Sequence, residues 1–256
     1  MCGIVGYTGE ASATPILVEG LTRMEYRGYD SAGVAVEQDG GIQVITRKGK
    51  VAELAHTLGH FEMTGTCGIG HTRWATHGKP SEANAHPHTS CSGDIAVVHN
   101  GIIENFAELR EELVGRGHVF KSETDTEVVA HLVEESYHRM LAEGTGDLRA
   151  AVAEAAARLV GAYGLAVMAC GETGSYVASD IIAMIDATRD VVVLADGQMA
   201  RLRPDGIEYY DEAGNPIKPD VTHVDWDLDV AEKGGYPDFM LKEIHEQPRV
   251  IRDTLA

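Results

Sequence analysis

The first seven residues constrain the fold of this chain more than any other stretch. Removal of Met1 makes Cys2 the first residue, and Cys2 then carries both a thiol and a free α-amine. The run that follows, residues 4–7, is apolar and β-prone, so it predicts a buried strand that holds the cysteine at its start. Gly3 and Gly6 permit close backbone approach in this strand.

The two groups on Cys2 define a candidate nucleophile that carries its own base. A thiol attacks as the thiolate, and the reference pKa of an α-amine is about 8. A useful fraction of the amine is therefore unprotonated at neutral pH and can accept the thiol proton, through a water because direct contact is cramped. The competing interpretation is a start methionine followed by an ordinary cysteine in a buried strand.

Composition limits the partners of the chain. The formal net charge of -19, from 40 acidic and 21 basic residues, repels phosphate backbones, so we expect no nucleic-acid partner. The 256 residues are enough for one large or two small domains, and no run approaches the roughly 18 apolar residues of a membrane span. A cleavable leader is not apparent, so we expect a cytoplasmic protein without a membrane partner.

The cysteines do not predict a disulfide framework or a metal site. The sequence has four, Cys2, Cys67, Cys91 and Cys170, without C-x-x-C spacing or a paired cysteine and histidine cluster. We expect the last three to be packing or surface thiols. No cofactor is expected.

Hydrophobic periodicity predicts an alternation of helices and short strands. Helices are expected over residues 15–24, 51–58, 108–114, 148–160 and 242–248, the last of them broken by Pro248. Strands are expected over residues 33–37, 42–47, 68–71, 95–99, 165–169, 177–180, 191–194, 199–203 and 206–210, and the first two form a hairpin. Short strands separated by polar turns are typical of mostly antiparallel sheets.

Two polar loops have the composition of a binding site. Residues 25–33 are rich in glycine and include Arg27, and such a loop often lines a site, although a capped turn with a surface arginine is the alternative. In residues 71–80, Arg73 follows a strand and suits bidentate capture of a carboxylate. Thr76 and His77 add polar contacts in a loop able to close over a ligand.

The histidines in and after this second loop do not predict a metal centre. They are His71, His77, His86, His88 and His99. None has the H-E-x-x-H spacing of a zinc motif, so we expect no metal here.

Two further motifs follow. Asn100 and Gly101 end a strand and place a side-chain amide beside an unobstructed backbone N–H, which suits an oxyanion hole; a simple Asn-Gly turn is the alternative. Residues 122–127 have the pattern of a helix start with Thr124 or Asp125 as the cap. The carboxylate of Asp125 also suits a ligand ammonium group.

Taken together, residues 1–6, 25–33, 71–78, 99–103 and 122–127 resemble the class II glutamine amidotransferases, and within them the hexosamine-forming branch. The resemblance implies an α+β protein with the N-terminal nucleophile hydrolase fold, a four-layer αββα sandwich of two mostly antiparallel sheets. It implies an amidotransferase domain over residues 1–240. Residues 241–256 then begin the linker to an absent sugar-isomerase domain, which binds fructose 6-phosphate in a full-length homodimer.

The resemblance also implies roles in the hydrolysis of L-glutamine to glutamate and ammonia through a thioester. In the family pattern Cys2 is the nucleophile and base, and Asn100 and Gly101 form the oxyanion hole. Arg73 holds the substrate carboxylate and Asp125 holds its ammonium group. Trp74, Thr76 and His77 belong to the loop that covers the site, and Arg27 supports the nucleophile. His86 is matched in the family without an assigned role.

This sequence departs from the family pattern after residue 170. The family has a longer stretch where only residues 171–175 are present here, and a true deletion would remove core strands and expose apolar surface. The alternatives are another class II amidotransferase, such as asparagine synthetase or the phosphoribosylamine-forming enzyme, and a glutamine-binding remnant without catalysis.

Overall fold

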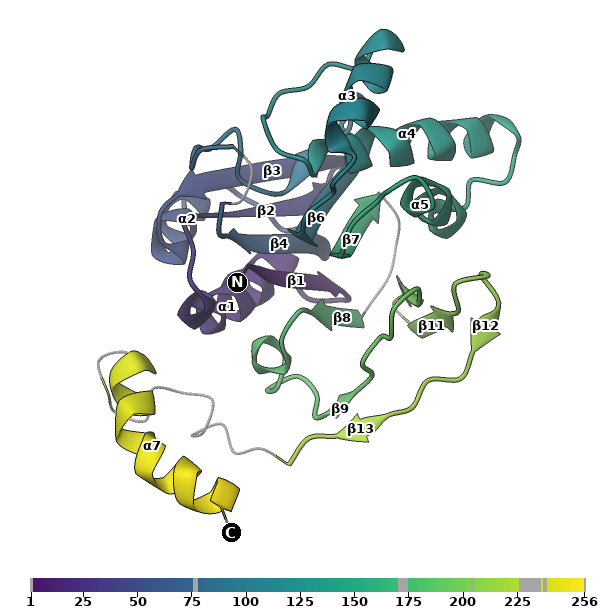
Figure 1. The fold of residues 1–256 in the computed structure, drawn as a ribbon. Coiled ribbons are helices and arrows are strands. Elements are labelled where there is room, and N and C mark those ends of the chain that lie inside the picture. The colour runs from purple at the N-terminus through teal and green to yellow at the C-terminus, as the bar shows by residue number, and fades with distance from the viewer. Residues whose placement is uncertain are drawn as a thin grey trace. The chain divides into compact units, whose positions relative to one another are not determined.

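The computed structural model describes residues 2–75, 78–169, 175–203, 205–225, 236 and 239–255 (Figure 1). The chain divides into two compact units, each considered by itself. The first contains Met1–Met184 and Leu194–Pro219, and the second contains Ile185–Val193 and Asp220–Ala256.

The first unit contains a five-stranded antiparallel sheet in the order β3-β2-β4-β1-β8. Its strands are β1 (Gly3–Thr8), β2 (Ser31–Gln38), β3 (Gly41–Lys48), β4 (Cys67–Arg73) and β8 (Ser175–Ala178). The predicted hairpin joins β2 to β3 through Asp39 and Gly40, whose φ angles of 55° and 77° give the doubly left-handed turn that suits twisted strands. Strand β1 is buried along its whole length, which confirms the predicted buried strand after Cys2.

A second antiparallel sheet has the order β5-β6-β7. Its strands are β5 (His88–Thr89), β6 (Ile95–Gly101) and β7 (Tyr163–Ala169). The two strands that flank residues 170–174, β7 and β8, lie at the edges of different sheets among the described residues. The shortened stretch noted in the sequence lies almost wholly outside the described residues.

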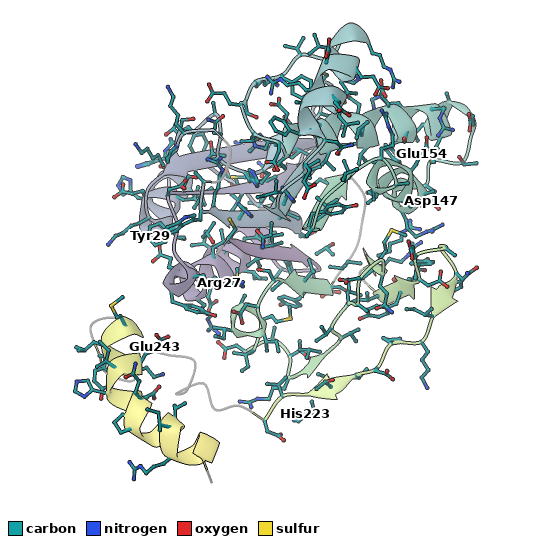
Figure 2. The ribbon with its side chains drawn as sticks, viewed as in Figure 1. Arg27, Tyr29, Asp147, Glu154, His223 and Glu243 are labelled. Carbon is teal, nitrogen blue, oxygen red and sulfur yellow. The ribbon has the colours of Figure 1, made fainter. Side chains whose placement is uncertain are left out.

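Helices cover the outer face of each sheet, on opposite sides of the pair (Figure 1). Helices α1 (Ala13–Arg23) and α2 (Val51–Leu58) pack on the first sheet, and α3 (Phe106–Gly115), α4 (Glu127–Ala142) and α5 (Leu148–Ala156) pack on the second. Asp147 caps α5 by accepting the N–H groups of Arg149 and Ala150 (Figure 2).

Alternation along the strands separates the layers. Val34 and Val36 of β2 pack in the core shared with α1, whereas Ala35 between them points to the other face. That inner face meets the second sheet, where the inner core consists of Ile4, Ala35, Ile69, Ala96 and Val98. The predicted four-layer αββα sandwich is therefore confirmed.

The remaining elements are short. The first unit also contains the short 3₁₀ helices η1 (Glu25–Arg27) and η2 (Ile181–Ala183). It further contains a small sheet of β10 (Met199–Arg203), β11 (Gly206–Tyr210) and β12 (Pro216–Ile217). The second unit contains the strand pair β9 (Asp190–Val191) and β13 (Thr222–His223) and helix α7 (Phe239–Leu255). In the described part of the chain, no helix has both the length and the apolar character needed to cross a membrane.

Three local predictions are wrong. The N-cap residue of α4 is Thr126 and the helix begins at Glu127, so neither Thr124 nor Asp125 is its cap. The Asp125 carboxylate accepts the N–H of Ile103 instead of an N–H group of the helix. Helix α5 ends at Ala156 rather than at residue 160. Pro248 lies inside α7, because a proline removes one hydrogen bond of a helix without always ending it.

Candidate active site

The strand alternation places the predicted site residues at one end of the space between the sheets. Ile4 and Ile69 face this space, so Cys2 in front of β1 and Arg73 at the end of β4 lie on the same side. In the register of β1 and β4, Gly3 is opposite Thr72, which brings Cys2 next to Arg73. On the second sheet Ala96 and Val98 face the same space, and Asn100 follows them.

The sulfur of Cys2 is held by the chain that follows β4. The backbone N–H of Trp74 donates to Cys2 Sγ over 3.1 Å, and the side chain of Cys2 is half-buried. The side-chain amide nitrogen of Asn100 donates to the Cys2 carbonyl oxygen over 3.2 Å. The residue in front of β1, the segment after β4 and the end of β6 therefore meet at this cysteine.

A buried histidine fixes the orientation of the Asn100 amide. His71 Nε2 lies 2.9 Å from Asn100 Oδ1, and burial lowers the pKa of His71 to about 3. His71 is therefore neutral, and because an amide oxygen only accepts, Nε2 carries the proton and donates. The Asn100 Nδ2 group then faces Cys2, with one N–H used by the Cys2 carbonyl and the other N–H left to donate to a ligand.

Only glycine fits the backbone conformation and the space at position 101. Its φ of 125° lies in the left-handed region, and a Cβ would lie 2.2 Å from the carbonyl oxygen of Ala162. Asn100 and Gly101 are the last residues of β6 and pair with Gly164 and Tyr163 of β7. The alternative of a simple Asn-Gly turn is therefore wrong.

The site contains one buried cation and one buried anion. Arg73 is 3% exposed and donates to the Gly78 carbonyl oxygen over 3.2 Å, and burial lowers its pKa. The groups whose negative charge opposes that shift are Asp30, Cys2 and Asp125. Asp125 is 4% exposed and accepts the N–H of Ile103 over 2.9 Å.

The glycine-rich loop of residues 25–33 supports the chain that follows Arg73. Gly28 has a φ of 90°, and a Cβ there would lie 2.5 Å from the ring of Trp74. The N–H of Asp30 donates to the Arg73 carbonyl oxygen over 2.7 Å, and the Asp30 carboxylate accepts the N–H of Ala75. Trp74 is 55% exposed. Thr76 and His77, which the sequence assigns to the same loop, lie outside the described residues.

Arg27 is not an isolated surface side chain. It comes from the turn between α1 and β2 (Figure 2), donates to the Ser179 carbonyl oxygen over 3.2 Å and lies 3.5 Å from Asp180 Oδ2. The Ser179 hydroxyl in turn accepts the N–H of Ile4 over 2.9 Å. Arg27 therefore braces the segment that borders the start of β1, and the turn with a surface arginine is not what the structure shows.

His86 belongs to a group of buried histidines whose rings contact one another, which the sequence pattern did not predict. It stacks on His71 at 4.4 Å between ring centroids, and His88 lies 4.8 Å away. Burial lowers the pKa of His86 well below its usual value and that of His88 to about 4. These rings are therefore neutral at pH 7. The sequence signal that could have placed His71 in the site is the period of two along β4, which puts residues 69, 71 and 73 on one face of the strand.

The chain belongs to the family of glutamine amidotransferase domains, which matches it over residues 55–184. The glutamine--fructose-6-phosphate aminotransferase of Symbiobacterium thermophilum is 51% identical over 275 aligned residues, and that of Thermus thermophilus is 48% identical over 274. Each alignment covers 100% of this chain and 44% of the relative, so the chain spans less than half of their length. Both alignments are longer than the 256 residues of this chain, which agrees with a stretch missing here.

Solved structures share the fold. A structure of the allosteric regulatory enzyme of purine biosynthesis superposes with a TM-score of 0.70 at 25% identity, over 84% of this chain and 50% of that one. The glutamine phosphoribosylpyrophosphate amidotransferase of B. subtilis superposes with a TM-score of 0.68 at 24% identity, over the same shares. The architecture of both is that of the N-terminal nucleophile hydrolases, as predicted.

Proposed function

We propose that this chain is a glutaminase domain that hydrolyses L-glutamine to glutamate and ammonia through a thioester on Cys2. The observation that carries the proposal is the meeting of a half-buried thiol, a correctly oriented amide and two buried opposite charges at one end of the sandwich. They come from the residue in front of β1, from β4, from β6 and from the segment before α4, which are far apart in the sequence.

The two buried charges match the substrate. Free glutamine has one carboxylate and one ammonium group, and we assign the carboxylate to Arg73 and the ammonium to Asp125. A guanidinium presents parallel N–H donors to a carboxylate, and burial strengthens both charged contacts. Trp74, Thr76 and His77 are assigned to the loop that covers the bound amino acid, and Arg27 to support of the nucleophile.

The reaction follows from the groups around Cys2. After removal of Met1 the α-amine takes the thiol proton, and Sγ attacks the side-chain carbonyl carbon of glutamine. The oxyanion accepts the second N–H of Asn100 Nδ2 and the N–H of Gly101. The carbon–nitrogen bond breaks, the leaving nitrogen takes a proton from the amine, and ammonia departs. Water, deprotonated by the same amine, attacks the thioester and releases glutamate and the Cys2 thiol.

We propose that this reaction takes place in a larger protein, which the length of the relatives supports. The relatives are named glutamine--fructose-6-phosphate aminotransferases, and this chain matches 44% of their length. We propose that the chain is the glutaminase half of such an enzyme, with residues 241–256 leading into a sugar-isomerase domain in which ammonia converts fructose 6-phosphate to glucosamine 6-phosphate. The full-length protein is proposed to be a cytoplasmic homodimer, and this chain alone releases ammonia into solvent.

Glutamate release tests the proposal. Purified chain whose mass shows that Met1 is absent is expected to form glutamate and ammonia in equal amounts from L-glutamine, and Cys2→Ala is expected to form neither. Binding of glutamine without turnover would instead favour the binding-only alternative. With the full-length protein, transfer to fructose 6-phosphate separates the proposed branch from other class II amidotransferases.

A further inference from the structure

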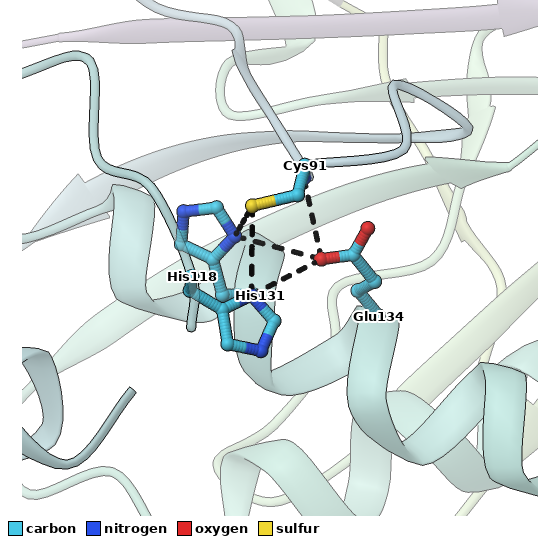
Figure 3. A group of neighbouring side chains, drawn as sticks. All are labelled: Cys91, His118, His131 and Glu134. Atoms are coloured by element: carbon cyan, nitrogen blue, oxygen red, sulfur yellow. Dashed lines mark hydrogen bonds and ion pairs between the residues drawn. The ribbon is translucent and has the colours of Figure 1, made fainter. Parts of the chain in front are cut away.

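A second cluster of metal-ligating side chains lies where the β5–β6 loop and the segment after α3 meet α4. Cys91 belongs to the loop between β5 and β6, His118 to the segment after α3, and His131 and Glu134 to α4, one turn apart. Figure 3 shows that the sulfur, one nitrogen of each imidazole and one carboxylate oxygen point toward a common centre.

The distances between these ligand atoms are short and similar. Cys91 Sγ lies 3.7 Å from His118 Nδ1 and 3.7 Å from His131 Nδ1. Glu134 Oε2 lies 3.3 Å from His118 Nδ1 and 3.6 Å from His131 Nδ1. All four ligand atoms lie within 4.8 Å of one another.

We propose that Cys91, His118, His131 and Glu134 form a four-coordinate binding site for Zn²⁺. With bonds of about 2.3 Å to sulfur and about 2.0 Å to nitrogen or oxygen, a tetrahedral zinc ion separates sulfur from nitrogen by about 3.5 Å and nitrogen from oxygen by about 3.3 Å. Four of the six separations among the ligand atoms come close to these values, and the other two are no longer than 4.8 Å.

The charges of the ligands suit a divalent cation of the zinc type. A thiolate and a carboxylate together neutralise Zn²⁺, so the complex has no net charge in a place where His131 and Glu134 are buried. A thiolate with two imidazoles favours Zn²⁺ over Mg²⁺ or Ca²⁺, which prefer oxygen ligands. Cys91 is exposed, which gives the ion a route from solvent.

The surroundings of the four ligands have the pattern of a metal site. The second nitrogen of each histidine lies near a carboxylate: His118 Nε2 is at hydrogen-bond distance, 3.2 Å, from Glu135 Oε1, and His131 Nε2 is at ion-pair distance, 3.8 Å, from Glu127 Oε1. Such outer carboxylates orient the imidazole and make it a better ligand. Glu134 Oε1 accepts the N–H of Ser92 over 2.7 Å, and Oε2 accepts the N–H of Cys91 over 3.2 Å and keeps a second lone pair for the ion.

The site has a structural role, because four protein ligands leave no open position for a substrate. The ion ties the β5–β6 loop and the segment after α3 to α4, the helix that directly follows Asp125. Binding releases the Cys91 thiol proton to solvent, and the ion stabilises the folded chain because the ligands converge only after folding. This site differs from the sequence-based expectation that Cys91 is a packing or surface thiol.

Metal binding is measured on the Cys2→Ala, Cys67→Ala chain, which removes the active-site thiol and a thiol outside the cluster. After dialysis against Zn²⁺ we expect one zinc per chain by elemental analysis. Substitution with Co²⁺ is expected to give the charge-transfer absorption of a cobalt thiolate. Absence of this absorption, or no zinc retained above the dialysis buffer, overturns the proposal whatever the behaviour of further variants.

Ligand variants locate the ion. In the same background Cys91→Ser and His118→Ala are each expected to weaken Zn²⁺ binding more than about a hundredfold, and Glu135→Gln about tenfold. His60→Ala, which changes a histidine outside the cluster, leaves the affinity unchanged. Circular dichroism checks the fold of every variant. Zinc affinity that survives both Cys91→Ser and His118→Ala places the ion elsewhere and contradicts the proposed site.

Discussion

The two histidine-rich regions of this protein use the same side chain in opposite ways. Around Asn100, His71 and His86 stack on each other, and burial lowers the pKa of both, so they remain neutral. Around Cys91, His118 and His131 lie between carboxylates. The first group positions an amide through hydrogen bonds of fixed direction, and the second offers converging lone pairs to a cation. The neighbours of a histidine therefore decide its chemistry more than its place in a motif.

The largest effect expected in the first region comes from Gly101→Ala. The new Cβ would lie 2.2 Å from the Ala162 carbonyl oxygen, at a φ that other residues rarely adopt, so the β6–β7 pairing has to shift. We expect loss of more than about a thousandfold in glutaminase kcat, together with a lower melting temperature. Gly117→Ala, also at a positive φ but in open space, is the control and should leave kcat unchanged.

Asn100→Ala is expected to come next. It removes one oxyanion donor while leaving the strand intact, and such a loss lowers kcat by about a hundredfold to a thousandfold. Steady-state kinetics on L-glutamine give the value, and KM should change little. An unchanged kcat would exclude Asn100 from the oxyanion hole.

His71→Leu tests the neutral histidine as a positioning residue. Without the donor at Nε2 the Asn100 amide can rotate, so we expect kcat to fall by about tenfold to a hundredfold with an unchanged KM. His71→Gln, which keeps an N–H donor at a similar distance, should recover part of that loss. If both variants lose the same activity, His71 acts only through packing.

The pH dependence of stability tests the buried histidines of the first region. His71 and His88 have folded pKa values of about 3 and about 4, below the usual 6.5, so the unfolded chain binds more protons below pH 6.5. The contribution of these two histidines to the free energy of unfolding should therefore fall from pH 6.5 to pH 5, whereas His131, whose pKa is raised by Glu127 and Glu134, contributes with the opposite sign. Urea unfolding of the unaltered chain and of His88→Gln measures this contribution, and the variant should reduce the slope.

The smallest effect is expected from Glu135→Gln in metal-free protein. Glu135 pairs with His118 and with Arg116 near the surface, and exposed ion pairs contribute about 1 kcal/mol or less. The free energy of unfolding should therefore change little until Zn²⁺ is added. A large loss without metal would mean that the carboxylate holds the fold and does not serve an ion.

Much of the first region could be predicted because its residues lie on strands. The period of two along β4 puts His71 and Arg73 on the face of Ile69, and the run 95–99 aims Asn100 at the same space. Local pattern failed for Asp125, because its carboxylate binds the N–H of Ile103 from another segment rather than a helical N–H. It failed for Pro248 because a proline weakens a helix without always ending it.

The second region could not be predicted from spacing. Cys91, His118 and His131 come from three segments that meet only when α4 packs on the sheet, and no short motif relates them. His131 and Glu134 share a helix face, but a histidine and a glutamate three residues apart are common on solvated helices. The convergence of the four ligand atoms is a property of the folded chain.

The central claim is that Cys2 is a working nucleophile, and glutamate release tests it most directly. Chain shown by mass to begin at Cys2 is predicted to convert L-glutamine to equal amounts of glutamate and ammonia, with no turnover by Cys2→Ala of matched stability. Turnover retained in Cys2→Ala, or glutamine bound by the unaltered chain without release of glutamate, would contradict the account.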